Sequence, residues 1–186
     1  MRNLLLSLVV SCFALCSCAT QSTFTLQQDA VEVEFGGSYL YTEYPEEGYY
    51  RRALSFDTIV TWYPASVGPT FELYNSWAKT KYRPVGATQY TWVVAPFVGA
   101  TIFFSNAEIV PYIRPLIGMG YQKVNTNGST DSDSCFAFGL GAGLKFGVSR
   151  DVTFNTELGW RRFEWDEDFG EKQDTFGLTF GFSIWF

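Results

Sequence analysis

Residues 178–186, LTFGFSIWF, decide the fold. Leu178, Phe180, Phe182, Ile184 and Phe186 alternate with Thr, Gly, Ser and Trp. Strict alternation of this kind is typical of a β-strand with one apolar face. The end of a soluble domain is usually polar and frayed. We therefore expect this segment to be buried to its last residue, either in protein or in lipid.

The same alternation recurs along the rest of the chain. Seven further segments have apolar residues at every second position, and we interpret each as a strand. They are residues 31–41, 53–63, 70–77, 90–104, 109–122, 135–148 and 152–161. Residues 109–122 are the least regular, since Pro111 and Pro115 each remove a ladder donor.

Short and long connections alternate between these segments. The short ones are PASVGP, SNAE and SRD, and the long polar ones are TEYPEEGYYRR, AKTKYRPVGATQ, KVNTNGSTDSDS and RFEWDEDFGEKQD. No segment is long enough for a helical crossover between parallel strands. The predicted fold is all-β, an eight-stranded antiparallel up-and-down transmembrane β-barrel over residues 31–186.

The first nineteen residues have the layout of a secretory signal peptide: Arg2, then an apolar run, then small residues. We expect cleavage after Ala19, which leaves residues 20–30 as a short periplasmic segment. In the alternative, LCSC is a lipobox and Cys18 is acylated. Either way the mature chain keeps too few cysteines for a disulfide framework or a cysteine-rich metal site, and we expect neither metal nor cofactor.

Composition narrows the function classes. The formal net charge is -6 and no basic stripe is present, which argues against a nucleic-acid partner. Aromatic residues make up 19% of the chain and charged residues 17%, so a disordered protein is also excluded.

Alternation does not reveal whether the apolar face lines the barrel or coats it. A soluble ligand-binding barrel would place it inside and would need no detergent. Three features favour a membrane barrel: a Gly, Ser and Thr-rich polar face, strand segments of about ten residues, and Tyr and Trp near both strand ends. We expect an upper girdle that includes Tyr39, Tyr41 and Trp160, and a lower one of Trp62, Tyr63 and Trp185.

The closing segment resembles the C-terminal signature of bacterial outer-membrane proteins, with Phe180, Phe182, Ile184 and Phe186 at the matching places. Residues 31–186 are similar in architecture to the small eight-stranded barrels OmpX, Ail and the OmpA barrel domain. The resemblance implies a monomer in the bacterial outer membrane, inserted by the barrel-insertion machinery that reads the signature. It fixes fold and location better than activity.

Eight charged residues fall on the inward parity. A barrel of this size is just wide enough for its side chains to fill, and unpaired charges there are costly. We predict that each of the three cations contacts an acid and that the network is a structural plug; the alternative is a narrow ion pathway. The residues are Glu32, Glu34, Asp57, Glu72, Arg114, Lys145, Glu157 and Arg161.

Outer-membrane barrels with known chemistry, among them lipid A deacylases and palmitoyltransferases, phospholipases and omptin proteases, resemble one another in using a catalytic histidine. This chain contains no histidine, and without one a serine nucleophile lacks its usual base. We therefore expect no enzymatic activity and predict no catalytic residue.

Two loops suggest ligands. Lys79, Lys81 and Arg83 are candidate contacts for lipopolysaccharide phosphates, although exposed basic residues are common. Asp166 and Asp168 have calcium-like spacing, but Gly170 follows and no Glu closes the loop, so a solvated acidic loop is preferred.

The expected function is a non-enzymatic outer-membrane barrel with a structural or surface-interaction role, with its loops facing outside and its lumen plugged. The alternative is a narrow channel, or a path for small apolar molecules as in OmpW-like barrels.

Overall fold

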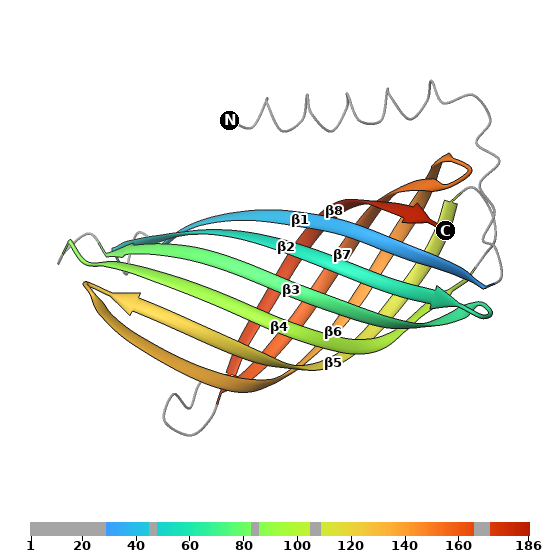
Figure 1. Cartoon of the computed structure of the whole chain (residues 1–186). Helices are drawn as coiled ribbons and strands as arrows, with labels where there is room; N and C mark the ends of the chain where they lie inside the picture. The colour runs from blue at the N-terminus through green and yellow to red at the C-terminus, as the bar shows by residue number, and fades with distance from the viewer. Residues whose placement is uncertain (1–28, 45–47, 83–85, 105–108, 166–171) are drawn as a thin grey trace, which may run out of the picture.

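Eight antiparallel strands close into a barrel in the computed structural model, which describes residues 29–44, 48–82, 86–104, 109–165 and 172–186 (Figure 1). Each strand pairs with its neighbour in sequence, and β1 pairs with β8. The predicted fold class is confirmed. The strands are β1 (Ala30–Tyr44), β2 (Tyr49–Tyr63), β3 (Val67–Tyr82), β4 (Thr88–Phe103), β5 (Ile109–Thr126), β6 (Ser129–Ser149), β7 (Val152–Trp165) and β8 (Lys172–Trp185).

The last strand closes the barrel against the first. Residues 32–37 of β1 pair with residues 180–185 of β8 in antiparallel register. Beyond them, the Val31 N–H donates to the Phe186 carbonyl at 3.1 Å, and the Phe186 N–H donates to the Val31 carbonyl at 2.9 Å. Because unpaired backbone groups are costly in hydrocarbon, this closure is what allows a sheet to cross a bilayer.

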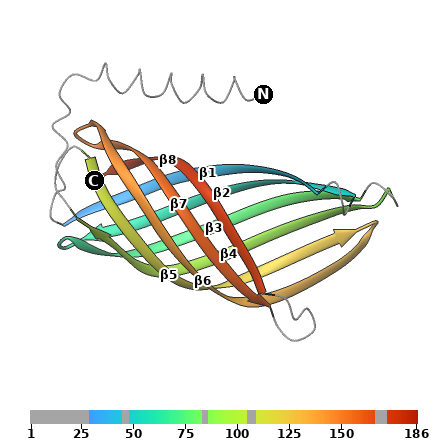
Figure 2. The same ribbon diagram turned by 180° about the vertical axis from the view of Figure 1, so that it is seen from behind.

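The two faces of the sheet differ as the alternation predicts. Large apolar side chains lie exposed on the outer wall, including Phe35, Phe56, Val98, Ile117 and Leu158, whereas the charged residues of the inward parity are buried. The lumen is therefore polar and the outer wall apolar, as a membrane barrel requires. Viewed from the front and from behind, the strands wrap obliquely around one axis (Figure 1, Figure 2).

The predicted lower girdle is wrong in two of its three members. Trp62 lies on the outer wall, but Tyr63 and Trp185 are buried in the lumen. The two rings stack with centroids 4.9 Å apart, and Tyr63 also contacts Phe103 at 4.8 Å. The physical reason is strand parity: consecutive residues point to opposite faces, so Tyr63 cannot share the direction of Trp62.

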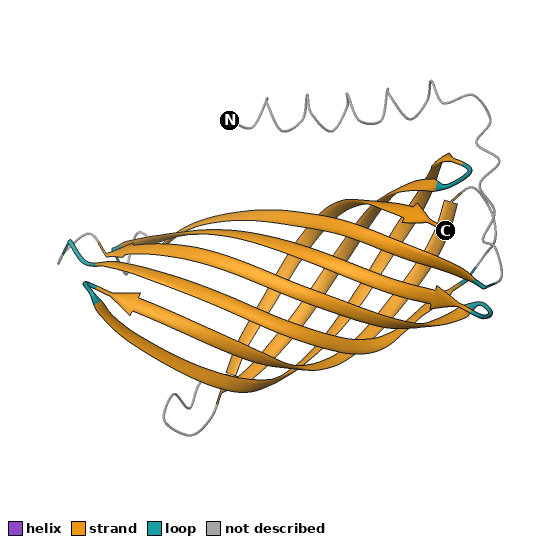
Figure 3. Cartoon of the chain, viewed as in Figure 1, coloured by secondary structure: helices purple, strands orange, loops and turns teal. Residues whose placement is uncertain are grey.

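The long polar linkers are largely strand, which corrects the expected loop boundaries. The described strands contain 14 to 21 residues, and almost the whole described chain is drawn as strand in Figure 3. The segment KVNTNGSTDSDS, predicted as a loop, is the outer part of a β5–β6 hairpin in which Thr126 pairs with Ser129. Backbone ladders need no apolar side chains, so the alternation ends before the strand does.

The turn of this hairpin is set by two residues. Asn127 has φ of 52° and Gly128 has φ of 91°. Both values lie in the left-handed region that Asn and Gly tolerate best, and a two-residue loop of this kind matches the twist of a hairpin.

The two prolines of β5 do not end the strand. Pro111 keeps its register against Leu144 of β6. On the β4 side, the ladder described has no pair between Gly99↔Leu116 and Ile102↔Ile113, a gap that contains Pro115. A proline without its N–H interrupts one ladder while the other continues.

Glycines of β6 make room for side chains in the lumen. A Cβ on Gly141 would lie 2.6 Å from the carboxylate of Glu157, and one on Gly143 would lie 2.6 Å from the Tyr112 hydroxyl. Both distances are shorter than van der Waals contact. These two glycines therefore allow a carboxylate and a tyrosine to fit inside a narrow barrel.

Four predictions fall wholly or mostly on residues outside the described ranges: the signal peptide of residues 1–19, the periplasmic segment of residues 20–30, the acidic pair Asp166 and Asp168, and Arg83. Within the described ranges, no helix combines the length and apolar character needed to cross a bilayer.

Candidate functional site

The eight charged residues of the inward parity all lie buried in the lumen. Five are acids and three are bases, so the carboxyl groups outnumber the cations. They come from six different strands, and their side chains meet in the middle of the barrel. They are Glu32, Glu34, Asp57, Glu72, Arg114, Lys145, Glu157 and Arg161.

Arg114 is the centre of this network. One of its terminal nitrogens donates to Glu34 Oε2 at 2.8 Å and the other to Glu157 Oε2 at 2.6 Å. Its Nε donates to the Thr101 hydroxyl at 3.1 Å. All three directions of the guanidinium are occupied, which is the condition under which a fully buried arginine is tolerated.

Lys145 extends the network toward the short-turn end. Its Nζ donates to Glu32 Oε1 at 2.6 Å and to Glu34 Oε2 at 3.0 Å. Glu34 Oε2 thus accepts from both Lys145 and Arg114. The two cations share one carboxylate, so removal of either leaves a buried charge only partly compensated.

Arg161 forms the part of the network nearer the long loops. Its Nε and a terminal nitrogen donate to Glu72 Oε1 at 3.0 Å and 2.6 Å, and Asp57 Oδ2 lies 3.6 Å away. The guanidinium carbon lies 4.7 Å from the centre of the Tyr74 ring. Arg161 is therefore held by charge and by a cation–π contact.

Tyrosine hydroxyls donate further hydrogen bonds to two of the five acids. The Tyr63 hydroxyl donates to Glu32 Oε2, and the Tyr112 hydroxyl donates to Glu157 Oε2 at 3.0 Å. Toward the long loops the charges give way to apolar side chains from β3 to β7. These are Tyr74, Val93, Ala95, Phe97, Leu116, Cys135, Ala137 and Phe163.

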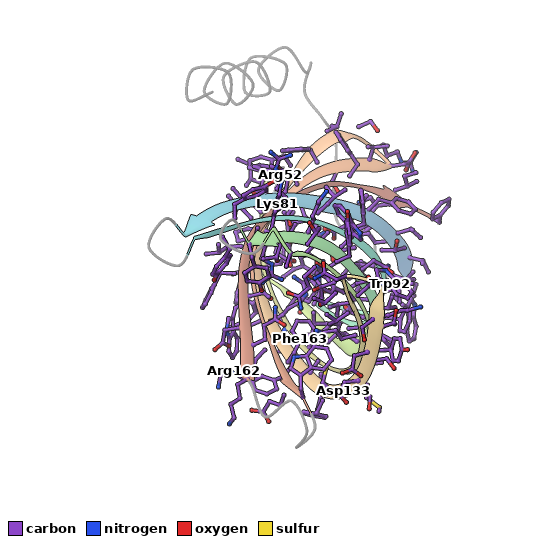
Figure 4. The ribbon with its side chains drawn as sticks, turned by 90° about the vertical axis from the view of Figure 1, so that its left-hand side faces the viewer. Arg52, Lys81, Trp92, Asp133, Arg162 and Phe163 are labelled. Atoms are coloured by element: carbon purple, nitrogen blue, oxygen red, sulfur yellow. The ribbon has the colours of Figure 1, made fainter. Side chains whose placement is uncertain are left out.

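Two of the predicted lipopolysaccharide contacts lie on one basic strip, which we define as Arg52, Lys79 and Lys81 on the outer wall. Arg52 pairs in register with Lys79. The Lys79 Nζ lies 5.2 Å from the Tyr90 ring centre, and the Arg52 guanidinium lies 5.6 Å from that of Tyr50. Lys81 pairs with Tyr50, two residues before Arg52, and Figure 4 shows Arg52 and Lys81 on the same side of the barrel. Cations over interfacial aromatics are placed where lipid headgroups would meet them.

The residues of the terminal signature lie on the outer wall. Their side chains are exposed on the apolar outer wall, and none points into the lumen. They are Phe180, Phe182, Ile184 and Phe186. Cys135, by contrast, is a buried free thiol packed in the apolar cluster.

A second polar group on the outer wall, which we call the outer-wall cluster, consists of Trp160, Arg162, Glu164, Lys172 and Asp174. Arg162 donates twice to Asp174, at 2.8 Å each, and the Trp160 indole donates to the same carboxylate at 2.9 Å. Lys172 lies 3.3 Å from Glu164. Figure 4 shows Arg162 on the outer wall, whereas its neighbour Phe163 lies inside the barrel.

The outer-wall cluster was not predicted from the sequence. RFEWDEDFGEKQD was assigned to a loop, so its charges were not given a face. The signal was present nonetheless: Arg162 and Glu164 continue the parity of the apolar face of β7, and Lys172 and Asp174 continue that of β8. Charged residues at lipid-facing positions are costly within hydrocarbon. A run of them on that parity therefore indicates either the membrane–water interface or a functional site.

Replacing Lys145 with methionine tests how much the lumen network contributes to the stability of the folded barrel. The substitution keeps the length of the side chain but leaves Glu32 and Glu34 without their shared cation, which should lower the free energy of unfolding by about 3 kcal/mol or more. Urea unfolding in detergent micelles, followed by tryptophan fluorescence, measures it. The matched control Lys79→Met removes an outer cation and should cost less than about 1 kcal/mol. Equal losses would contradict a central role for Lys145.

A family model described as lipid A 3-O-deacylase (PagL) matches residues 47–164 of the chain. The matched range covers β2 to β6 and β7 as far as Glu164, and it includes three residues of the outer-wall cluster. No curated protein sequence matches the chain significantly.

Solved structures of outer-membrane barrels share the fold. The Ail protein of Yersinia pestis, in complex with the heparin analogue sucrose octasulfate, is 13% identical, with a TM-score of 0.58, and the match covers 86% of this chain and 100% of that one. Neisserial surface protein A is 11% identical (TM-score 0.53, 83% and 95% covered). A major outer membrane protein from Thermus thermophilus is also 11% identical (TM-score 0.53, 84% and 98% covered). At these identities the likeness shows the fold alone.

The family match and these neighbours place the protein in the bacterial outer membrane. They also correct one expectation. The prediction that the chain is not an enzyme is wrong, because the matching model describes an enzyme family. The lack of histidine argues only against a serine–histidine arrangement; carboxylates can also accept protons.

Proposed function

The chain belongs to the lipid A 3-O-deacylase (PagL) family, and from this we propose that it hydrolyses an acyl ester of lipid A in the outer leaflet of the outer membrane. The observation that carries the proposal is the outer-wall cluster. It sets acids and bases side by side on the lipid-facing wall, beside Trp160 and near the long-loop end. An interfacial aromatic marks the level at which lipid headgroups and their ester bonds lie.

Ester hydrolysis needs a proton acceptor for the nucleophile and positive charge near the developing oxyanion. Since the chain has no histidine, we assign the acceptor role to Glu164. Asp174 is already bonded to Arg162 and Trp160, whereas Glu164 makes a longer ion pair with Lys172. Glu164 is thus the better placed of the two carboxylates to accept a proton from water.

The proposed step is a single displacement by water. Glu164 accepts a proton as the water oxygen bonds to the ester carbonyl carbon, and the oxyanion forms beside Lys172. The bond from that carbon to the sugar oxygen then breaks, and the sugar oxygen takes the proton from Glu164. The products are a free fatty acid and lipid A with a hydroxyl at the cleaved position. Arg162 and Asp174 hold the wall in place around the ester.

Purified protein in detergent micelles with lipid A tests this function. Mass spectrometry should detect loss of one ester-linked acyl chain, and Glu164→Gln should slow release by about a hundredfold, since general-base catalysis contributes roughly that much or more. Asp151→Asn, at the short-turn end, is the matched control and should leave the rate unchanged. Lipid A that keeps all its acyl chains with the wild-type protein would refute the proposal.

We also propose that the basic strip contacts lipid A phosphates, with Arg83 as a further contact. Removing Lys79 and Lys81 together as methionines should weaken lipopolysaccharide binding by roughly fivefold for each cation lost, as exposed charge pairs contribute up to about 1 kcal/mol each. Binding to labelled lipopolysaccharide in micelles measures it. Arg150→Met, at the opposite end of the barrel, serves as the control. Full binding by the double variant would exclude the strip.

The lumen network is best explained as a plug rather than as an ion pathway, and we propose that role for it. The ion pairs of Arg114, Lys145 and Arg161, with apolar side chains on either side, support it. In planar bilayers the protein should show no steady conductance; a persistent open state in single-channel records would contradict a plug.

For Phe180, Phe182, Ile184 and Phe186 we propose contact with the barrel-insertion machinery, and for the protein a monomeric state.

A further inference from the structure

A cavity of about 530 Å³ opens at the long-loop end of the lumen, and we call it the vestibule. Its size is within the range of roughly 300–1,000 Å³ that holds small-molecule ligands. It is lined by residues of β2 to β8, and it lies on the far side of the apolar cluster from the buried charges. The vestibule is therefore separate from both the lumen network and the basic strip.

The vestibule contains one buried donor and one buried acceptor that lack partners. The Arg51 Nε and the Asp133 Oδ2 are shielded from solvent, and neither has a hydrogen-bond partner among the residues that the structure describes. Both side chains line the cavity. Buried polar atoms are nearly always satisfied, so this pair calls for a ligand that can accept from one group and donate to the other. A hydroxyl group does both.

Aromatic rings stand next to these polar groups. The rings of Tyr49 and Tyr82 lie 5.5 Å apart, and the Tyr82 hydroxyl donates to Gln89 Oε1 at 3.2 Å. Trp165 stacks on Phe163 at the edge of the apolar cluster. Flat rings offer apolar faces to the C–H face of a sugar, while amides, acids and hydroxyls offer hydrogen bonds to its edge.

The charges around the vestibule are mixed in sign. Two cations, Arg51 and Lys172, and three acids, Asp131, Asp133 and Asp174, line it. A site for a polyanion would gather cations alone, as the basic strip does on the outer wall. The vestibule instead suits a neutral ligand with many hydroxyl groups.

We propose that the vestibule binds a sugar unit of a surface glycan. The ligand stacks against the vestibule aromatics, and its hydroxyls pair with Arg51, Asp133 and Gln89. The same sugar chemistry has two sources at a cell surface: the core oligosaccharide of the bacterium's own lipopolysaccharide, or a glycan of another cell. Lys172 and Asp174 border both the vestibule and the outer-wall cluster, whereas Arg51, Asp133 and Gln89 belong to the vestibule alone. The proposal therefore does not rest on lipid A hydrolysis, and its variants lie outside the residues assigned to that reaction.

An array that carries both kinds of glycan tests the proposal. Its two arms are core oligosaccharides cleaved from lipopolysaccharide and neutral mammalian-type glycans, and it is probed with the full mature protein in detergent micelles. We expect binding to at least one neutral glycan, and the arm in which it occurs identifies the source. Binding to sulfated or phosphorylated glycans alone, or to no glycan in either arm, would overturn the proposal.

Matched variants then test which residues contact the bound sugar. Arg51→Met and Asp133→Ala should each weaken binding by about tenfold or more, because each removes a charged hydrogen-bonding group. Arg150→Met is the control, since it makes the same change at the exposed short-turn end of the barrel, outside both the vestibule and the basic strip. Gln89→Ala gives an uncharged second variant, and heat-modifiable gel mobility reports that each barrel is folded. Equal losses in Arg51→Met and Arg150→Met, or no loss in any vestibule variant, would overturn the site.

Discussion

The pairing of backbone groups in a medium without water is the constraint from which the rest of this structure follows. A sheet can cross hydrocarbon only if its first and last strands hydrogen-bond to each other, as β1 and β8 do. Closure divides every strand into an outward and an inward face. The outward face must be apolar, and the inward face must fill a space about as wide as its own side chains.

Filling that narrow space explains why the lumen is layered and where activity can lie. Stacked rings near Tyr63 close one end, ion pairs around Arg114 fill the middle, and apolar side chains around Phe97 separate them from the vestibule. A packed interior leaves little room for a substrate. Chemistry on a lipid is therefore expected on the wall, and recognition of soluble groups at the open mouth, where function can change without disturbing the core.

Period-two alternation predicted the fold, the two faces of the sheet and the buried charges, because alternate residues of each strand in a membrane barrel face lipid and the polar lumen. Strand ends were not predictable in this way: residues 123–134 continue the ladder without apolar alternation, outside the apolar band. Tyr63 and Trp185 were predicted in the outer girdle from their aromatic character, but strand parity directs both into the lumen. The outer-wall cluster was missed because Arg162 and Asp174 are neighbours only across two strands. Enzymatic activity was wrongly excluded because the absence of one residue type removes one mechanism, not all of them.

The two-residue turn at Asn127–Gly128 fixes how far the β5–β6 hairpin reaches from the cell. Tyr121 of β5 is an exposed aromatic residue of the outer wall. The residues that follow it rise by about 3.3 Å each, so the tip at Thr126 stands roughly 17 Å beyond Tyr121 before strand tilt is counted. The turn is too short to bend freely, and both arms are hydrogen-bonded to each other up to Thr126 and Ser129. An antibody or phage that approaches the bacterium would meet a preformed epitope at a constant height and would have little conformational entropy to remove on binding.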